Sequence, residues 1–368
     1  MKDDALRDLP ENLTVPRTDA VYNCHAYLTK VPIGAIKPFI EAFTQPGDIV
    51  ADFFAGSGMT GLAAVKAGRQ AALSDISVLG RHIGLGYLTR VPDDVLRQSA
   101  EHVVATARKK LGTLYMTVRS QDGEATEMVR YVWSFTYVCP QCDHKLVYFE
   151  HVSPTGSPPS ACPHCAAAFS KRIWRRAEDV PVQAVVRGID GTLTDQPIAP
   201  VDLERIAAAA TDKRLKKVPF LEIDASREMF SRSGLGKVGL TKTKDFFSDR
   251  NAIALYELWD AIGSVTDEKV RQKLRFCFTA ILARASRRYQ WSAKRPLNAQ
   301  NQTYYIAPVY YEWNIFELFW RKVEASVRAD AELFPGDASK AVNAPATYTT
   351  ASAANLKHLH DASVDYVF

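Results

Sequence analysis

The stretch VADFFAGSGMTGLAA, residues Val50 to Ala64, decides how the N-terminal part of the chain folds. An apolar run ends in Asp52 and leads into Gly56, Gly58 and Gly61, which stand in a G-x-G-x-x-G frame. Glycine lets the backbone approach a ligand closely, and the start of the following helix can donate free N–H groups. The stretch therefore predicts a turn that holds a ligand with a nucleotide moiety.

The segment around this turn alternates helical and extended patterns. We expect a helix at 34–43, a strand at 49–54, a helix at 60–68 and a strand at 70–75. Such alternation is typical of a βαβ unit, whose strands are parallel and joined by right-handed crossovers. The sequence therefore predicts an α/β fold with a doubly wound sheet.

Two acidic residues narrow the choice of ligand. Asp75 ends the second strand 19 residues after Gly56, where a carboxylate can bind ribose hydroxyls, so a dinucleotide is one interpretation. Asp52, however, ends the first strand with an acid, which suits a ligand that carries an amine. S-adenosylmethionine (SAM) has an amine and a ribose but no pyrophosphate, and we favour it over a dinucleotide or a turn that only packs helix on strand.

Residues 52–60, DFFAGSGMT, resemble motif I of the DNA methyltransferases that modify the exocyclic amino group of adenine or cytosine, D-P-F-A-G-S-G-T-T. Phe53 and Met59 are the two departures. Residues 25–32, HAYLTKVP, are similar to a looser form of the family's motif X, H-P-T-Q-K-P. The resemblance is close from Asn23 to about Gly84, and a weaker likeness continues at 241–262 and 354–368.

The resemblance implies a Rossmann-like SAM-dependent methyltransferase sheet, partial in this chain, and a set of cofactor-binding residues. Asp52 and Phe54 would flank the two ends of SAM, two glycines would line it, and Asp75 would bind the ribose. A lone histidine is more often structural, so we favour that role for His25. The cofactor-binding candidates are Lys30, Pro32, Asp52, Phe54, Gly56, Gly58, Thr60 and Asp75.

The resemblance also implies a catalytic tetrapeptide, Asp/Asn/Ser-Pro-Pro-aromatic, that accepts the N–H groups of a flipped-out base and stacks on it. The Pro158-Pro159 pair lacks the aromatic residue and is interpreted as a loop. The C-terminal LKHLHDASVDYVF is similar to the stretch that precedes this tetrapeptide. We therefore expect no catalytic residue in this chain and place the motif just after Phe368. The chain would then be an inactive part of a longer enzyme, completed by the missing C-terminal half, or of a split enzyme, completed by a second polypeptide.

Four of the six cysteines form two C-x-x-C pairs, each with a proline after its first cysteine. Two such pairs with a spacer of this size are typical of a zinc ribbon, in which four thiolates bind one structural Zn²⁺. The predicted metal ligands are Cys139, Cys142, Cys162 and Cys165.

Two segments, SKRIWRR at 170–176 and RASRRYQWSAKR at 284–295, combine cations with aromatic residues. Cations neutralise phosphates and aromatic rings stack on bases, so both segments are candidates for a DNA-binding surface, although a solvated charged face explains each equally well. The DNA-binding candidates are Arg172, Arg175, Arg176, Arg287, Arg288, Trp291 and Arg295.

The length of 368 residues predicts two or three domains. We expect a SAM-binding half at 1–115, a zinc-ribbon insertion at 116–180, a mostly helical insertion at 181–345 and a return to the sheet at 346–368. Residues 180–240 are interpreted as linker and loop.

The net charge of +5 is too small to identify a partner by itself. The charged N-terminus lacks an apolar signal region, and the chain has no run of about 18 apolar residues. We expect a cytoplasmic protein without a membrane partner. An RNA methyltransferase and a non-catalytic zinc-ribbon DNA-binding protein remain alternatives.

Overall fold

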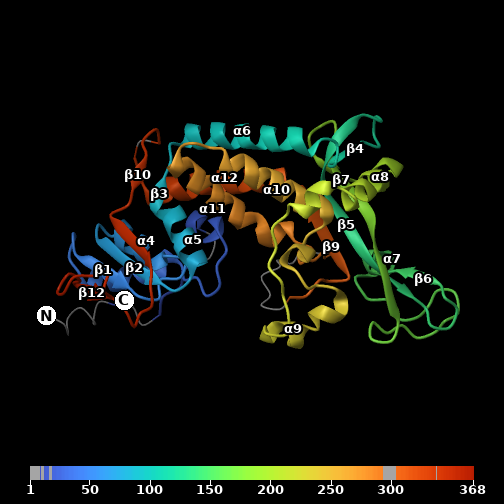
Figure 1. Cartoon of the computed structure of the whole chain (residues 1–368), viewed down its shortest axis with the longest axis horizontal. Helices are drawn as coiled ribbons and strands as arrows, with labels where there is room; N and C mark the ends of the chain where they lie inside the picture. Colours follow the sequence, from blue (N-terminus) through green and yellow to red (C-terminus); the bar gives the residue numbers. More distant parts are fainter. Residues whose placement is uncertain (1–8, 10–11, 16–18, 293–303, 337) are drawn as a thin grey trace. The chain divides into compact units, whose positions relative to one another are not determined.

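The computed structural model describes residues 9, 12–15, 19–292, 304–336 and 338–368 (Figure 1). The chain divides into two compact units. The first unit comprises Met1–Val103, Ile262–Ala280 and Phe319–Phe368, and the second comprises Val104–Ala261 and Ile281–Leu318. Four helices contain residues of both units: α6 (Asp93–Leu111), α10 (Asp249–Gly263), α11 (Glu268–Ala285) and α12 (Ile315–Leu333).

A parallel sheet forms the centre of the first unit. Its strand order is β11-β2-β1-β12, and every neighbouring pair is parallel. The expectation of an α/β fold with a parallel sheet is confirmed. The strands are β1 (Ile49–Asp52), β2 (Gln70–Asp75), β11 (Ala346–Thr350) and β12 (Tyr366–Val367).

Short helices accompany this sheet: α2 (Ala20–Cys24), α3 (Ile33–Phe43), α4 (Met59–Lys66) and α5 (Val78–Leu88). Val50 and Ala51 of β1 are fully buried, as expected for a parallel strand covered on both faces. Gly61 brings α4 close to β2, because a Cβ at this position would lie 2.5 Å from Cδ1 of Leu73. The third glycine of the G-x-G-x-x-G frame therefore serves helix packing.

The first unit also holds a two-stranded antiparallel ladder, β3 (Thr89–Arg90) with β10 (Val342–Asn343). A buried ion pair lies near it: Nζ of Lys273 is 2.7 Å from Oδ1 of Asp330. The same ammonium donates to the carbonyl groups of Gly86 and Thr89, each at 2.8 Å. Lys273 therefore joins α11, α12 and the end of α5.

An antiparallel sheet forms the second unit, with the long strand β5 at its centre. Its β-branched and aromatic residues, VRYVWSFTYV, favour a strand. The strands are β4 (Met116–Val118), β5 (Ala125–Val138), β6 (Lys145–Val147), β7 (Arg175–Arg187), β8 (Leu193–Gln196) and β9 (Val309–Trp313).

Residues 180–240 are more ordered than linker and loop, so that expectation is wrong. They contain the end of β7, strand β8 and several helices, and the boundary predicted at residue 180 falls inside β7. The basic cluster DKRLKK and the Gly/Ser stretch at 231–240 favoured the linker interpretation of the whole segment. Besides the parts of α6, α10, α11 and α12 that belong to it, this unit contains the helices α7 (Tyr148–Thr155), α8 (Pro200–Ala210), η1 (Lys213–Lys216), α9 (Glu228–Ser233), η2 (Leu235–Val238) and η3 (Thr243–Phe246).

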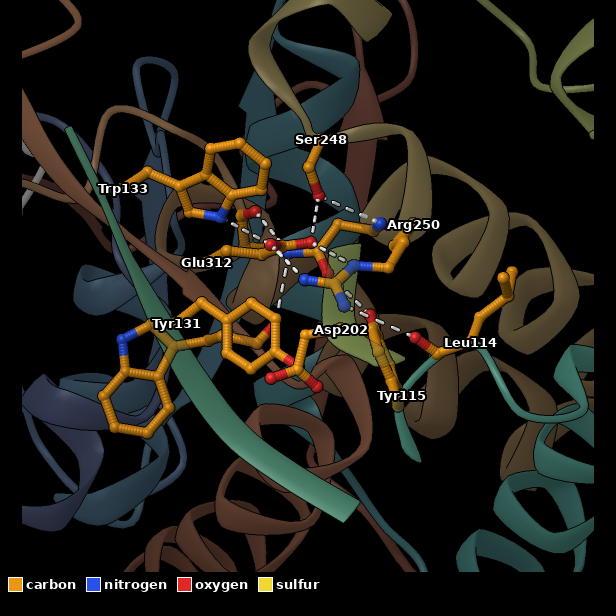
Figure 2. A network of polar contacts seen from close by, with 11 residues as sticks. Leu114, Tyr115, Tyr131, Trp133, Asp202, Ser248, Arg250 and Glu312 are labelled. Carbon is orange, nitrogen blue, oxygen red and sulfur yellow. Dashed lines mark hydrogen bonds and ion pairs between the residues drawn. The ribbon is translucent and has the colours of Figure 1, made fainter. Parts of the chain in front are cut away.

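A buried ion pair connects α10 to β9 in the second unit (Figure 2). Arg250 and Glu312 are 2% and 1% exposed, and the guanidinium bonds both carboxylate oxygens, at 3.1 and 2.6 Å. The Trp133 indole N–H and the Ser248 hydroxyl donate to the same carboxylate, at 2.7 and 2.6 Å. The buried charge of Glu312 is thus fully compensated.

Replacing Arg250 with methionine leaves the Glu312 carboxylate buried without its charge partner. We expect Arg250→Met to lower the free energy of unfolding by about 3–5 kcal/mol, measured by urea denaturation. The double variant Arg250→Met, Glu312→Leu should recover most of this loss, because no charge then stays buried. A single variant as stable as the wild type would contradict this account.

Candidate functional site

The carboxyl ends of the parallel strands bring the predicted cofactor residues of the first unit together. Asp52 ends β1, Asp75 ends β2, and Thr350 of β11 pairs with Asp75. The glycine turn follows β1 at this same edge. In open α/β sheets, ligands bind at the carboxyl ends of the strands, so this edge is the candidate site.

The Asp75 carboxylate holds the turn. One oxygen accepts the backbone N–H of Gly56 at 2.8 Å, and the other accepts the N–H of Ser77 at 2.8 Å. Asp75 therefore joins the end of β2 to the glycine turn and to the start of α5. The sequence indicated a role for Asp75 toward a ribose but not this positioning role.

The glycine turn lies tightly between several neighbours. Gly56 and Gly58 have positive φ angles, 51° and 80°, which favour glycine. The Tyr348 hydroxyl donates to the Gly56 carbonyl at 2.6 Å, and burial raises the pKa of Tyr348 so that it keeps its proton. A Cβ on Gly80 of α5 would lie 2.4 Å from the Gly56 oxygen. Sequence reasoning missed Tyr348 and Gly80, since their role depends on contacts across the fold.

Exposed apolar side chains follow the two acids. Asp52 is 8% exposed and accepts the Phe54 N–H at 2.9 Å, while Phe54 itself is 81% exposed. Ile76, directly after Asp75, is 75% exposed. An apolar surface beside a carboxylate suits a ligand that combines a flat ring with hydroxyl groups. Ile76 was missed, although its place after a strand-ending acid could have indicated it.

Residues 25–32 reach the glycine turn through Tyr27, because a Cβ on Gly56 would lie 3.0 Å from the Tyr27 ring. Lys30 holds this segment from inside: its ammonium donates to the His25 carbonyl at 2.6 Å and to the Tyr22 carbonyl. Burial lowers the pKa of Lys30 to about 8. Pro32 precedes α3 as its N-cap residue. Thr60, also a candidate, is buried in the first turn of α4.

His25 is buried, and its ring contacts protein groups on both sides. Nδ1 lies 2.8 Å from the Ala26 carbonyl oxygen, and Nε2 lies 3.0 Å from the Thr279 hydroxyl. Burial lowers the pKa of His25 to about 3, so the ring is neutral in the folded protein. These contacts favour the structural interpretation of His25.

The four paired cysteines lie together in the second unit, with all Sγ atoms within 4.8 Å of one another. Sγ of Cys139 is 3.6 Å from that of Cys165, and Sγ of Cys142 is 3.7 Å from that of Cys162. A tetrahedral zinc site with Zn–S bonds of about 2.3 Å requires S–S distances of about 3.8 Å. The donor set therefore fits one tetrahedral ion.

The two cysteine pairs have matching backbone turns. The N–H of Asp143 bonds the Cys139 carbonyl, and the N–H of Ala166 bonds the Cys162 carbonyl, each at 3.0 Å. Asp143 and Ala166 both have positive φ angles, 56° and 61°. Equivalent turns present each pair of thiols in the same way, as two halves of one metal site require.

Several DNA-binding candidates bind other groups of the second unit. Arg176 lies 2.6 Å from Asp179 and stacks over Phe135. Arg287 lies 3.7 Å from the same Asp179 and donates to the Asp245 carbonyl. These two arginines therefore have structural partners.

The other candidates differ in exposure. Arg172 and Arg175 are exposed, whereas burial lowers the pKa of Arg288, which lies 5.6 Å from the centre of the Tyr304 ring. The Trp291 ring packs edge-on against Phe149, with 5.2 Å between centroids. Arg295 lies outside the described residues.

Comparison with known proteins agrees with the resemblance. Residues 10–85 match the model of the N6/N4 methyltransferase family, described as DNA methylase. A protein named "Putative methylase YubD" from Escherichia coli (strain K12) is 50% identical over 42 residues, which cover 11% of this chain and 18% of that relative. This N-terminal segment is therefore similar to the N6/N4 DNA methyltransferase family.

The matched segment contains the glycine turn and Asp75, so the candidate site lies within the part of the chain that resembles the DNA methylases. The chain spans about a fifth of the length of this curated relative. No solved structure matches it. Among the residues that the structure describes, no helix combines the length and apolar character needed to span a membrane.

Because the neutral ring of His25 is buried, the stability of the folded protein should depend on pH. Below its ordinary pKa of 6.5, the ring gains a proton in the unfolded chain but not in the folded one until about pH 3. The stability contribution of His25 is therefore lost as pH falls from about 6.5, by up to about 1.4 kcal/mol per pH unit. The stability advantage of the wild type over His25→Gln should shrink accordingly in denaturation curves between pH 7 and pH 4. Parallel pH profiles would contradict the assignment.

Proposed function

We propose that this chain is the SAM-binding part of an enzyme that methylates the exocyclic amino group of adenine, or of cytosine, in DNA. The carrying observation is the edge of the parallel sheet, where Asp52, the glycine turn and Asp75 meet within the segment that matches the DNA methylases. Adenine is the preferred target in this proposal.

The residues at this edge fit the chemistry of SAM. The Asp52 carboxylate would bind the amine, the backbone at Gly56 and Gly58 would lie along the ligand, and Asp75 has lone pairs left for ribose hydroxyls. Phe54 and Ile76 offer exposed apolar surface for the adenine ring. When bound, SAM supplies an electrophilic methyl group.

Lys30 and Pro32 would act indirectly in this proposal. The Lys30 ammonium binds backbone carbonyls, so its contribution would be to fix the segment that contains Tyr27 beside the glycine turn. Pro32 would fix the start of α3. Both residues would thereby shape the methionine end of the site.

Methyl transfer to a base also needs an acceptor for the amino N–H groups and a ring that stacks on the base. No Asp/Asn/Ser-Pro-Pro-aromatic tetrapeptide occurs in the printed sequence. We therefore propose that these groups come from further polypeptide, in the same chain or in a partner.

Isothermal titration with SAM tests the cofactor site. We expect Asp75→Asn to weaken binding by about tenfold or more, since it removes charge-assisted hydrogen bonds to the ribose and weakens the hold on the glycine turn. Ile76→Ala should weaken binding as well, without loss of stability, because Ile76 is exposed. Val95→Ala, a similar change on α6, should bind SAM like the wild type. A wild type that does not bind SAM would contradict the proposal and favour a non-catalytic DNA-binding protein.

A methylation assay separates the DNA substrate from an RNA substrate. Methylation of tRNA rather than DNA by the completed enzyme would favour an RNA methyltransferase.

We further propose that Cys139, Cys142, Cys162 and Cys165 bind one structural zinc ion. Four thiolates leave no position for a reactive water, so the ion would stabilise the fold and not take part in chemistry. It would fix the two turns at one end of β5.

Metal analysis of the purified chain tests this proposal. We expect one zinc per chain in the wild type and in Cys277→Ala, which changes a buried cysteine of the first unit that is not part of the cluster. Cys142→Ser should lose the metal and unfold at a lower temperature. A wild type with well under one zinc per chain would refute the proposal.

A further inference from the structure

A pocket of about 350 Å³ in the second unit brings the two basic and aromatic segments of the sequence together. Lys171 comes from the first segment and Trp291 from the second, so residues 120 positions apart line one cavity. Its wall includes Tyr148, Lys171, Gln290, Trp291, Tyr305 and Val309.

Strand β9 holds the aromatic side of this pocket in place. The backbone N–H of Trp291 donates to the Val309 carbonyl at 3.1 Å, and Gln290 forms an antiparallel bridge with Tyr310. The Trp291 ring meets Phe149 at 73°, edge to face. Trp291 is therefore a fixed, half-buried wall and not a loose surface side chain.

The opposite side carries positive charge. Nζ of Lys171 lies 4.6 Å from the centre of the Tyr148 ring, so the ammonium is held at the pocket wall. Arg172 and Arg175 follow along the chain and are exposed. No carboxylate of the described residues lines this pocket. Another cavity of this unit, of about 370 Å³, differs in its lining, which combines four carboxylates, Asp179, Asp245, Asp249 and Glu312, with Lys244, Arg250 and Arg287.

Aromatic walls, one cation and one side-chain amide match the chemistry of a nucleotide. Tryptophan and tyrosine rings stack on bases of any sequence, and lysine neutralises a phosphate. The Gln290 amide can donate to and accept from the edge of a base. The volume lies within the range of sites for small ligands, about 300–1,000 Å³.

We propose that this pocket binds an unpaired base of the DNA strand, stacked on Trp291, with Lys171 on an adjoining phosphate. The inference rests on the proposed function, because it takes DNA as the substrate. It adds a binding site in the second unit, separate from the residues proposed for SAM.

Fluorescence anisotropy with a labelled DNA duplex that carries one unpaired thymidine tests the proposal. An otherwise identical duplex has an abasic residue in place of this thymidine. We expect the wild type to bind the thymidine duplex about fivefold or more tightly than the abasic duplex. A factor of about five corresponds to the lower end of the stacking free energy for one base. Trp291→Ala should lose this preference, whereas Trp291→Phe should keep most of it. Trp259→Ala removes an exposed tryptophan that does not line the pocket and should keep it fully.

The proposed contact between Lys171 and a phosphate can be tested separately, through the salt dependence of DNA binding. Lys171→Ala should weaken binding to both duplexes and reduce the slope of log affinity against log salt by about one. Lys216→Ala, an exposed lysine elsewhere in the second unit, should change the slope less. Equal binding of both duplexes by the wild type, an unchanged preference in Trp291→Ala, or tighter binding of the matching RNA bulge would overturn the inference. SAM titration is a separate measurement, so failure of the pocket would leave the proposed cofactor site untouched.

Discussion

The two hydrogen bonds of the Asp75 carboxylate are the interaction on which the candidate site depends. They join the end of β2 to Gly56 and to Ser77, and thereby position the glycine turn against α5. Tyr348 fixes the same turn from β11 through the Gly56 carbonyl. Gly80 leaves the space that this approach needs. One carboxylate thus organises the backbone that would surround a cofactor.

The sheet that carries this site is assembled from distant parts of the chain. Strands β11 and β12 lie near the C-terminus, yet they flank β2 and β1 in parallel register. The intervening sequence builds the second unit around β5, the cysteine cluster and the Arg250–Glu312 pair. A chain that leaves one sheet and returns to it can thus combine the proposed cofactor site with the base-binding pocket proposed in the second unit.

The local parts of this structure could be predicted from the sequence. The glycine turn, Asp75 and the four cysteines are encoded within short windows whose spacing reports their geometry. The contributions of Tyr348, Gly80 and Ile76 could not be read in the same way, because each depends on a neighbour or an exposure set by the tertiary fold. The pairing of β9 with β5 and the convergence of Lys171 and Trp291 on one pocket are likewise long-range. Helix α8 escaped prediction because the basic cluster DKRLKK and the Gly/Ser stretch at 231–240 favoured a linker interpretation of the whole segment.

The central claim is that the edge around Asp75 binds SAM, and hydrogen–deuterium exchange with mass spectrometry tests it most directly. The account predicts that saturating SAM slows exchange in peptides that cover residues 53–60 and 76–80, while peptides of the cysteine cluster keep their rates. Unchanged exchange around the glycine turn, or protection confined to the second unit, would contradict it.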